Sequence, residues 1–368
     1  MQTPKDIRYP ELDAVRGFAA LSVLVFHYAT MWRPPEAFDH GWRSLLYPFI
    51  AGHEAVLLFF LLSGLALSKM LSGARASFQR YAVRRVTRIY GPYLIALFFS
   101  IAGAAIWHNR ADFGLWSRTW GQPIDPFLVL QHILFLGHYD SSQYNLSFWS
   151  LIHELRISLL FPLLYAAIRS TRPVVVLPIA VLSSMFAHSR AQQHTKMHDL
   201  WVTAAYIGIF ACGVSIAENA EAISKWFSGL DRFKRVLFGI TSFALYSEGH
   251  RLGSAPAVWR FQEWSIIAGS AGLIVVAMNS VGVKRFLQTR VPQFLGKISY
   301  SLYLIHAAVL FALTALVWGK VPRSCFVVLY VLTALVLSTL FHRFVEQPFI
   351  RLSRSVTAKE VVATEAAV

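Results

Sequence analysis

The chain has 368 residues, of which 56% are hydrophobic and 14% are charged, whereas soluble domains are about 45–50% apolar and about 25% charged. With 14% aromatic residues and a mean hydropathy of +0.50, this composition excludes a disordered chain and argues against a soluble enzyme. The net charge of +15 would suggest nucleic acid in a soluble protein, but in a membrane protein the positions of the charges matter more. We therefore expect a lipid bilayer as partner, and no nucleic acid.

Apolar runs of close to twenty residues recur along the chain, which is the length a helix needs to cross about 30 Å of hydrocarbon at 1.5 Å per residue. They predict an all-α membrane domain over 1–350 with about ten transmembrane helices, followed by a polar, disordered tail over 351–368. The predicted spans are 12–31, 53–70, 90–107, 147–168, 173–188, 200–217, 236–249, 263–279, 298–318 and 324–342. The shorter stretch 126–139, with His132 and His138, is interpreted as a re-entrant or interfacial helix.

The distribution of Lys and Arg predicts the orientation of these spans. With both termini in the cytoplasm, 22 of the 34 Lys and Arg residues fall in inner segments, 10 fall in outer segments and two lie within spans. This asymmetry follows the positive-inside rule. If 126–139 crossed the membrane, every later basic loop would face outward, so the charge distribution favours ten spans.

The N-terminal sequence argues against a signal peptide, and the two cysteines argue against a disulfide or metal site. The first apolar run follows Asp13 and Arg16 and lacks a small-residue cleavage site after it, so we expect this span to be retained rather than removed as a signal peptide. Cys212 and Cys325 both lie in apolar runs, so neither a disulfide framework nor a metal site is predicted. The oligomeric state stays open.

The first predicted span carries two ionisable residues, Arg16 and His27. Eleven residues correspond to about 1100° of helical rotation, so the two side chains share a face and lie about 16.5 Å apart along the axis. Ionisable groups inside a span are costly and usually functional. The alternative is that Arg16 extends to the inner interface beside Asp13 and that His27 is hydrogen-bonded to a neighbouring helix.

A second group is the run of Arg80, Arg84, Arg85 and Arg88 before the third span. If this run is helical, it forms a cationic stripe that like-charge repulsion disfavours unless an anion binds there. Arginine is suited to bidentate phosphate contacts, so a polyphosphate is one candidate anion. Anchoring to anionic lipid head groups is the alternative.

Two further stretches place polar groups in predicted spans. Glu154 lies about 10 Å below the outer surface if the span begins near residue 147, and at this depth it could meet His27 or pair with Arg156. Another span carries Tyr300, Tyr303 and His306, which could equally serve packing. The chain has no Walker A loop, nucleophile elbow, zinc-binding H-E-x-x-H or dinucleotide fingerprint.

Together these stretches resemble the acyltransferase-3 family of integral membrane O-acyltransferases, from residue 12 to about residue 349. The matching stretches are Arg16 to His27 (R/K-x10-H), Phe59 to Gly64 (F-F-x-x-S-G), Arg85 to Arg88 (R-x-x-R), Trp149 to Glu154 (W-S-L-x-x-E), Ser299 to His306 and Glu346 to Phe349. Leu57 departs from the pattern, because many members carry an acidic residue there, and His53 and Glu54 lie just before it. No SGNH-type domain follows the spans, so we expect transfer to be completed within the membrane domain or on a bound acceptor.

The resemblance implies transfer of a short acyl group, acetyl by default, from cytoplasmic acyl-CoA to an acceptor hydroxyl reached from the outer side of a bacterial inner membrane. Acyl-CoA is then a co-substrate, and no permanently bound cofactor is expected. In this reading His27 is the general base or a transient acyl carrier, oriented by Glu154. The phosphates are held by Arg84, Arg85 and Arg88, with help from Arg16. Candidates for substrate or oxyanion contacts are Ser63, Trp149, Ser150, Tyr300, Tyr303 and His306.

The residues leave other functions open. A proton-coupled transporter or flippase would also use buried Arg16, His27 and Glu154, but it would be expected to show inverted repeats, which the sequence lacks. A membrane scaffold would leave these charges unexplained. The acceptor is not fixed either: the resemblance allows a surface carbohydrate, peptidoglycan, a lipid-linked oligosaccharide or a small metabolite.

Overall fold

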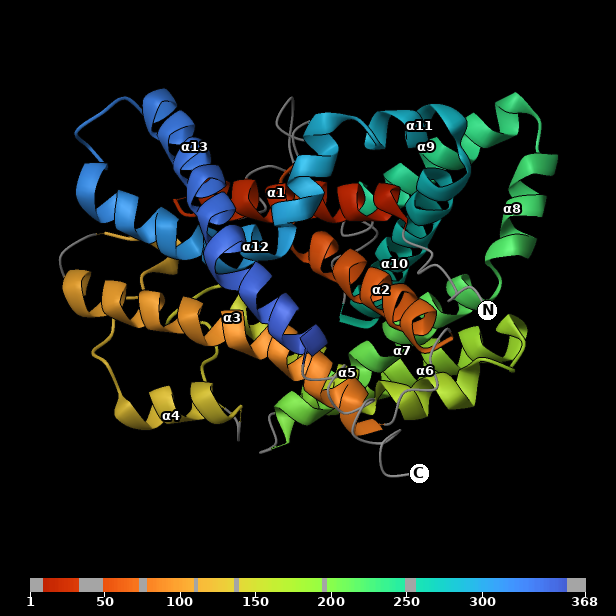
Figure 1. Ribbon diagram of the computed structural model, residues 1–368, viewed down its shortest axis with the longest axis horizontal. Helices are drawn as coiled ribbons and strands as arrows, with labels where there is room; N and C mark the ends of the chain where they lie inside the picture. The colour runs from red at the N-terminus through yellow and green to blue at the C-terminus, as the bar shows by residue number, and fades with distance from the viewer. Residues whose placement is uncertain are drawn as a thin grey trace. The chain divides into compact units, whose positions relative to one another are not determined.

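The computed structural model describes residues 9–32, 49–72, 78–108, 112–135, 139–193, 197–248 and 256–355. These residues are helical apart from short connections, and they contain no strand. The elements are α1 (Pro10–Ala29), α2 (Gly52–Ser72), α3 (Phe78–Trp107), the 3-10 turn η3 (Gly114–Trp116), α4 (Pro126–Leu134), α5 (Phe148–Ile168), α6 (Pro173–Ala191), α7 (His198–Glu218), α8 (Ala220–Gly229), α9 (Arg232–Glu248), α10 (Pro256–Asn279), α11 (Val281–Leu287), α12 (Arg290–Val317), α13 (Arg323–Phe341) and the π-helical turn η5 (His342–Glu346) (Figure 1).

Eight of the described helices are long and apolar enough to cross a membrane, namely α1, α2, α3, α5, α6, α7, α12 and the helix Arg323–Ser355 that contains α13. A ninth is obtained if Gln262–Asn279 and Val281–Leu287, which are bent by 89°, form one broken span. The predicted span 236–249 falls on α9, whose 17 residues would cover only about 25 Å. The all-helical, multi-pass prediction is confirmed, and the described part of the chain holds eight or nine candidate spans where about ten were predicted.

The stretch interpreted as re-entrant or interfacial contains a short helix, α4. Pro126 occupies the first turn, and the Asp125 side chain accepts a hydrogen bond from the backbone N–H of Phe127 at 2.8 Å, as expected of an N-cap. The nine residues of α4 extend about 13 Å and cannot cross a bilayer. His138 lies outside the described residues. At the C-terminus the helix continues through 355, and the rest of the predicted tail is not described.

The chain divides into two compact units, and each is described by itself. Unit 1 comprises Met1–Phe26, Phe38–Arg75 and Leu160–Ser299, and unit 2 comprises His27–Ala37, Ala76–Leu159 and Tyr300–Val368. The single membrane domain predicted over 1–350 is thus made of two packing units, and its boundary near residue 350 stays a prediction.

In unit 1, α7 packs against both α2 and α6. The close approach of α2 and α7 depends on two glycines, because a Cβ atom on Gly64 would meet the backbone of Phe210 and one on Gly213 would meet the backbone of Leu61. Small residues allow helix backbones to approach in the same way in membrane proteins generally. α10 packs against α9 and α2 in the same unit.

In unit 2 the long helix α3 and the start of α5 set the position of the polar groups. The side chain of Asn145, just before α5, donates to Ser100 Oγ of α3 at 3.1 Å and to the backbone oxygen of Leu304 of α12 at 2.9 Å. Its Oδ1 accepts from the backbone N–H of Ser147 at 3.1 Å. This buried residue therefore fixes the axial register of three helices at one level.

Candidate active site

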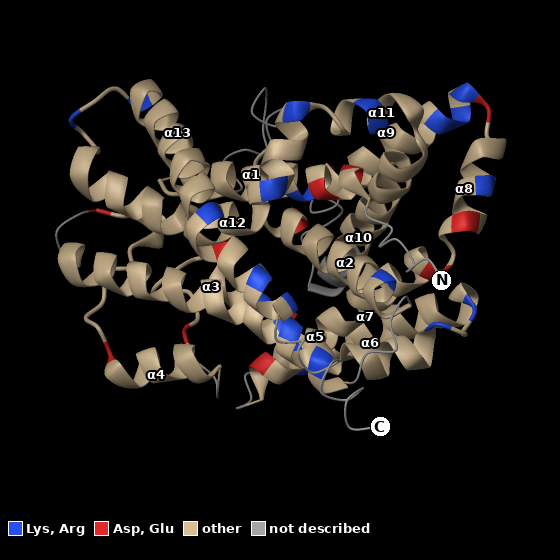
Figure 2. Cartoon of the chain, in the orientation of Figure 1, with Lys and Arg blue, Asp and Glu red and all other residues tan. Residues whose placement is uncertain are grey.

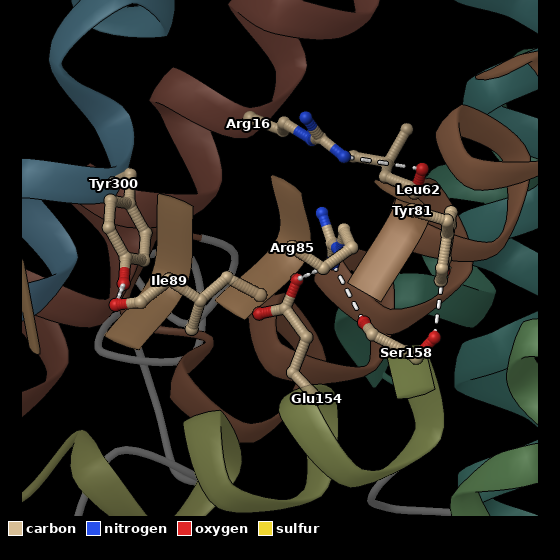
Figure 3. Close-up of polar contacts among 8 residues, drawn as sticks. All are labelled: Arg16, Leu62, Tyr81, Arg85, Ile89, Glu154, Ser158 and Tyr300. Atoms are coloured by element: carbon tan, nitrogen blue, oxygen red, sulfur yellow. Dashed lines mark hydrogen bonds and ion pairs between the residues drawn. The ribbon is translucent and has the colours of Figure 1, made fainter. Parts of the chain in front are cut away.

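The arginine run lies in the first turns of α3 (Figure 2). It is therefore helical, which is the condition for the predicted cationic stripe. Arg85 Nη2 donates to Ser158 Oγ at 2.8 Å and pairs with Glu154 Oε1 at 3.3 Å, both on α5. One turn earlier, the hydroxyl of Tyr81 donates to the backbone oxygen of Ser158 at 2.7 Å (Figure 3). The two helices are thus fastened together at the cationic end of α3, with the Arg85 guanidinium held in a fixed orientation.

Two other arginines of the run, Arg84 and Arg88, are not held in this way. Among the described residues, Arg84 and Arg88 have no hydrogen bond or ion pair, and Arg88 is exposed. The buried Nε of Arg85 also lacks a hydrogen-bond partner among the described residues. Guanidinium donors that are directed by the fold but not used by it are suited to binding an anion.

A buried carboxylate also lies within electrostatic range of Arg88. This is Glu346, in the π-helical turn η5, and Glu154 and Tyr300 are also within range of the same guanidinium. Glu346 Oε2 accepts from Ser301 Oγ at 2.6 Å and from His342 Nδ1 at 2.9 Å. A π-helical turn is rare and is often found at functional sites. Arg88 therefore belongs to a cluster of two arginines and two carboxylates in unit 2.

The buried imidazole of His27 is paired with a second buried imidazole, His306. His27 Nδ1 lies 2.8 Å from His306 Nε2, and the rings stack at a centroid distance of 5.1 Å. His306 Nδ1 lies 3.0 Å from the backbone oxygen of Leu302. Since a carbonyl oxygen can only accept, neutral His306 carries its proton on Nδ1 and accepts through Nε2. Neutral His27 then donates from Nδ1, which leaves the lone pair on its Nε2.

The ring of Trp116, on η3, approaches His27 edge-on at a centroid distance of 5.7 Å. Its indole Nε1 is buried and has no hydrogen-bond partner among the described residues. A buried N–H group without a partner is costly, so this donor is available for a ligand beside His27. The backbone N–H of the preceding Leu115 donates to the backbone oxygen of Met31 at 2.7 Å, which ties η3 to the segment that follows α1.

The hydroxyl groups named as oxyanion candidates are already hydrogen-bonded. Tyr300 donates to the backbone oxygen of Ile89 at 2.7 Å (Figure 3). Ser150 donates to the backbone oxygen of Ser147 at 3.1 Å, so the 2.6 Å contact between Ser150 and Tyr303 is donated by Tyr303. Trp149 packs edge-on against His153. The hydroxyl protons of Tyr300, Ser150 and Tyr303 are therefore donated to other groups of unit 2.

Glu154, expected to orient His27, is paired with Arg85 in the structure, and the partner of His27 is His306. The physical reason is axial register. Asn145 lies level with Ser100 and with Leu304, so α5 begins well below the end of α3. His306, which is hydrogen-bonded to His27, follows Leu304 by two residues and so lies near this level. Glu154 is nine residues further along the chain than Asn145 and lies roughly 13 Å deeper. The depth expected from the sequence assumed instead that residue 147 lies at the surface.

Some of the predicted site residues fall in unit 1. Arg16 donates to the backbone oxygen of Leu62 at 3.3 Å, and Ser63, the next residue, is buried. In the same unit His53 Nε2 lies 3.0 Å from Glu263 Oε1. The structure thus gives Arg16 and Ser63 a common neighbourhood at α2 of unit 1.

The structure adds three residues to those singled out from the sequence. Ser158 accepts hydrogen bonds from Arg85 and from Tyr81, and Trp116 contacts the ring of His27. Glu346 was noted only as part of a closing motif, without a role. The spacing of Ser158 four residues after Glu154 is a signal that the sequence does contain, because i and i+4 share a helix face. Nothing local marks Trp116.

The chain is similar to known acyltransferases along most of its length. A profile of the acyltransferase domain matches residues 9–343. The acyltransferase MdmB of Streptomyces mycarofaciens is 25% identical over 95% of this chain and 93% of its own length. The O-acetyltransferase OatA of Staphylococcus aureus (strain NCTC 8325) is 21% identical over 92% of this chain, but only over 57% of its own length. No solved structure matches the chain. This multi-pass membrane protein therefore belongs to the acyltransferase-3 family and is an acyltransferase.

Proposed function

We propose that the protein is an O-acyltransferase that moves a short acyl group, by default acetyl, from acyl-CoA to a hydroxyl group of a carbohydrate on the outer side of a bacterial cytoplasmic membrane. The observation that carries this proposal is the pair of polar centres in unit 2. One is the cationic cluster of Arg85 and Arg88, and the other is the histidine pair His27 and His306. The names of the bacterial relatives, an acyltransferase and an O-acetyltransferase, support the same reaction class.

The cationic cluster would bind the phosphates of acyl-CoA. Arg88 and Arg84 offer guanidinium groups that the described residues leave without an ion pair, while Glu154 and Ser158 hold Arg85 in place. Bidentate contacts between arginine and phosphate are short and charge-assisted. Glu154 would then be a positioning residue for the donor site.

The histidine pair would carry out the transfer. The lone pair on His27 Nε2 would take the proton of the acceptor hydroxyl, whose oxygen attacks the thioester carbonyl carbon. The C–S bond then breaks, and the CoA thiolate receives the proton from His27. His306 would hold His27 in the tautomer that this step requires, as the third member does in catalytic triads. An acyl-imidazole intermediate on His27 would use the same lone pair.

The developing negative charge on the thioester oxygen would need hydrogen-bond donors. Trp116 Nε1 is the nearest candidate, because it is a buried donor on the ring packed against His27. Tyr303 and Ser150 would support the wall of the site through their mutual hydrogen bond.

The experiment is acyl transfer from radiolabelled acetyl-CoA by the purified, full-length protein in nanodiscs, with bacterial cell-surface glycans as acceptor. We expect His27→Ala to lower turnover by about a hundredfold or more, because general base catalysis contributes about 10²–10⁴. Arg88→Ala should lower the rate at subsaturating acetyl-CoA. Lys225→Ala, an exposed site on α8, serves as the control and should retain full activity. Full activity in both His27→Ala and Arg88→Ala would overturn the proposal.

A further inference from the structure

A polar pocket between the end of α3 and the start of α5 takes no part in the chemistry described above. It has a volume of about 540 Å³ and is lined in part by the polar side chains of Arg118, Gln122, Asp125, Asp140 and Gln143. All of these residues belong to unit 2. Sites for small ligands typically measure about 300–1,000 Å³, so the pocket is large enough for one or two sugar rings.

The pocket is held open by a hydrogen-bonded frame. Its two chain segments, 117–125 and 139–144, are joined by contacts from Trp120, whose backbone N–H donates to the backbone oxygen of Gln143 at 3.1 Å and whose indole donates to that of Tyr144 at 2.9 Å. Thr119 Oγ1 donates to the backbone oxygen of Ser142 at 3.0 Å. A site that is already ordered loses less conformational entropy when it binds a ligand.

The frame rests on a buried aromatic base. Trp120 is fully buried and stacks on Trp107 at a centroid distance of 5.9 Å. It also contacts Phe311 at 5.4 Å. The hydroxyl of Tyr144 contacts both the backbone N–H and the backbone oxygen of Asp125 at 3.3 Å. The pocket walls are therefore fixed to α3 and α12 of unit 2 rather than carried by an independent loop.

The charge of the pocket selects the chemical class of its ligand. Arg118 contributes one positive charge and pairs with Asp140 at 3.4 Å, while Asp125 and Asp140 contribute two negative charges. The net charge of about −1 disfavours the phosphates of CoA. The polar side chains are amides, carboxylates and a guanidinium. Such a set can both donate to and accept from the hydroxyl groups of a sugar. A neutral, polyhydroxylated ligand fits this set.

The same chain segment connects the pocket to the histidine pair. Trp116, which packs against His27, precedes Arg118 of the pocket by two residues. Their Cα atoms are therefore at most about 7 Å apart. An acceptor with more than one sugar ring could thus occupy the pocket with one ring while a hydroxyl of another approaches His27.

We propose that this pocket is a saccharide subsite that binds a neutral sugar ring of the acceptor next to the ring that is acylated. The proposal rests on the proposed function, because it names the class of the acceptor. It assigns Gln143 and Asp140 as residues that contact the sugar and that determine acceptor specificity. It leaves binding of the donor to the arginines of α3.

The test measures binding of chitotetraose and maltotetraose to the full-length protein in nanodiscs by intrinsic tryptophan fluorescence. We expect at least one of these neutral oligosaccharides to bind, and we expect Gln143→Ala and Asp140→Ala each to weaken its affinity by about tenfold, the effect of losing one or two hydrogen bonds. Glu221→Ala removes an exposed ion pair on α8 and is the matched control. Binding of coenzyme A should be unchanged in all three variants.

Two results would overturn the proposal: failure of both oligosaccharides to bind the unmodified protein, or an unchanged affinity in both pocket variants. Gln143→Ala is informative even if Asp140→Ala disturbs the turn, because Asp140 also accepts from the backbone N–H of Ser142. The readout does not depend on turnover. Sugar binding without any acyl transfer would therefore contradict the proposed function and not the pocket, whereas acyl transfer without sugar binding would contradict the pocket alone.

Discussion

The pairing of His27 with His306 gives each ring a defined tautomer. The backbone oxygen of Leu302 requires the proton of His306 on Nδ1, and this in turn requires the proton of His27 on its own Nδ1. The lone pair of His27 is thereby placed on Nε2. A catalytic imidazole is commonly oriented through its second nitrogen in this way.

This arrangement predicts that His306 acts as a positioning residue. His306→Phe removes the acceptor for His27 Nδ1, and we expect kcat to fall by about tenfold to a hundredfold, the range seen when a metal-ligating histidine loses the group that orients its ring. The KM for acetyl-CoA should stay within about twofold of its original value. The measurement is steady-state acyl transfer at varied acetyl-CoA.

The control for this prediction is His306→Gln, whose amide oxygen can still accept from His27. We expect this variant to recover part of the lost kcat. Equal activity of His306→Phe and the unmodified protein would show that the tautomer of His27 does not depend on His306.

The burial of His132, on α4 outside the spanning helices, makes the stability of the fold depend on pH. Burial lowers the pKa of His132 to about 4, and the nearby Asp140 offsets this only in part. Its buried Nε2 has no hydrogen-bond partner among the described residues. The unfolded state therefore binds a proton between pH 6.5 and 4 that the folded state does not, so stability is full above about pH 6.5 and is lost as the pH falls toward 4.

We expect the free energy of unfolding to fall by about 2 kcal/mol from pH 7 to pH 5 through this residue. The measurement is reversible unfolding at both pH values for the unmodified protein and for His132→Phe, which cannot titrate. If the two proteins lose the same stability over this range, His132 does not make the predicted contribution.

For single residues, the sequence revealed which ionisable groups matter more readily than it revealed their partners. His27, Arg85 and Glu154 are visible as ionisable groups in or next to apolar runs. Which of them meet depends on how far each helix is shifted along its axis, and that shift is set by the hydrogen bonds of Asn145. A single sequence does not reveal this register, nor that Trp116 would lie against His27.

Among the elements, α2 and α7 show how glycine sets the packing of unit 1. A Cβ on Gly213 would meet the backbone atoms of Leu61 and Leu65, and backbone atoms cannot turn aside as a flexible side chain can. We expect Gly213→Ala to destabilise the fold by about 1–3 kcal/mol, as overpacking does elsewhere. The measurement is reversible unfolding in mixed micelles.

Gly282 on α11 is the matched control, because a Cβ there would meet nothing within 4 Å. We expect Gly282→Ala to be neutral or slightly stabilising, since alanine has the higher helix propensity. Equal effects of the two substitutions would mean that the α2 and α7 contact does not need glycine.

The sequence predicted the existence of these helices better than their ends. The third span was expected to start at residue 90, whereas α3 begins at Phe78. Hydropathy detects only the apolar part of a helix, and the turns that carry the arginines are too polar to register. For the same reason α9 was counted as a span from its apolar half, although its 17 described residues lie at the short end of the range for a membrane-crossing helix.

For the whole molecule, the proposed function separates donor binding from group transfer. The arginines lie on the first turns of α3, whereas His27 lies in the last turn of α1 and Trp116, whose ring contacts His27, follows the far end of α3. Within unit 2, Arg85 lies about 22 Å along α3 from Ser100, which is level with the start of α5. Substitution of the arginines should therefore weaken binding of the donor, whereas substitution of His27 should lower the rate of transfer.

The most direct measurement is the dissociation constant of coenzyme A for the full-length protein in nanodiscs, determined side by side for His27→Ala and Arg88→Ala. We predict that His27→Ala binds coenzyme A within about twofold of the unmodified protein, while Arg88→Ala binds at least about tenfold more weakly, because one charge-assisted phosphate contact contributes roughly 1.5–3 kcal/mol. Unchanged binding in Arg88→Ala, or an equal loss in His27→Ala, would contradict the assignment of the α3 arginines to the donor and of His27 to the transfer step.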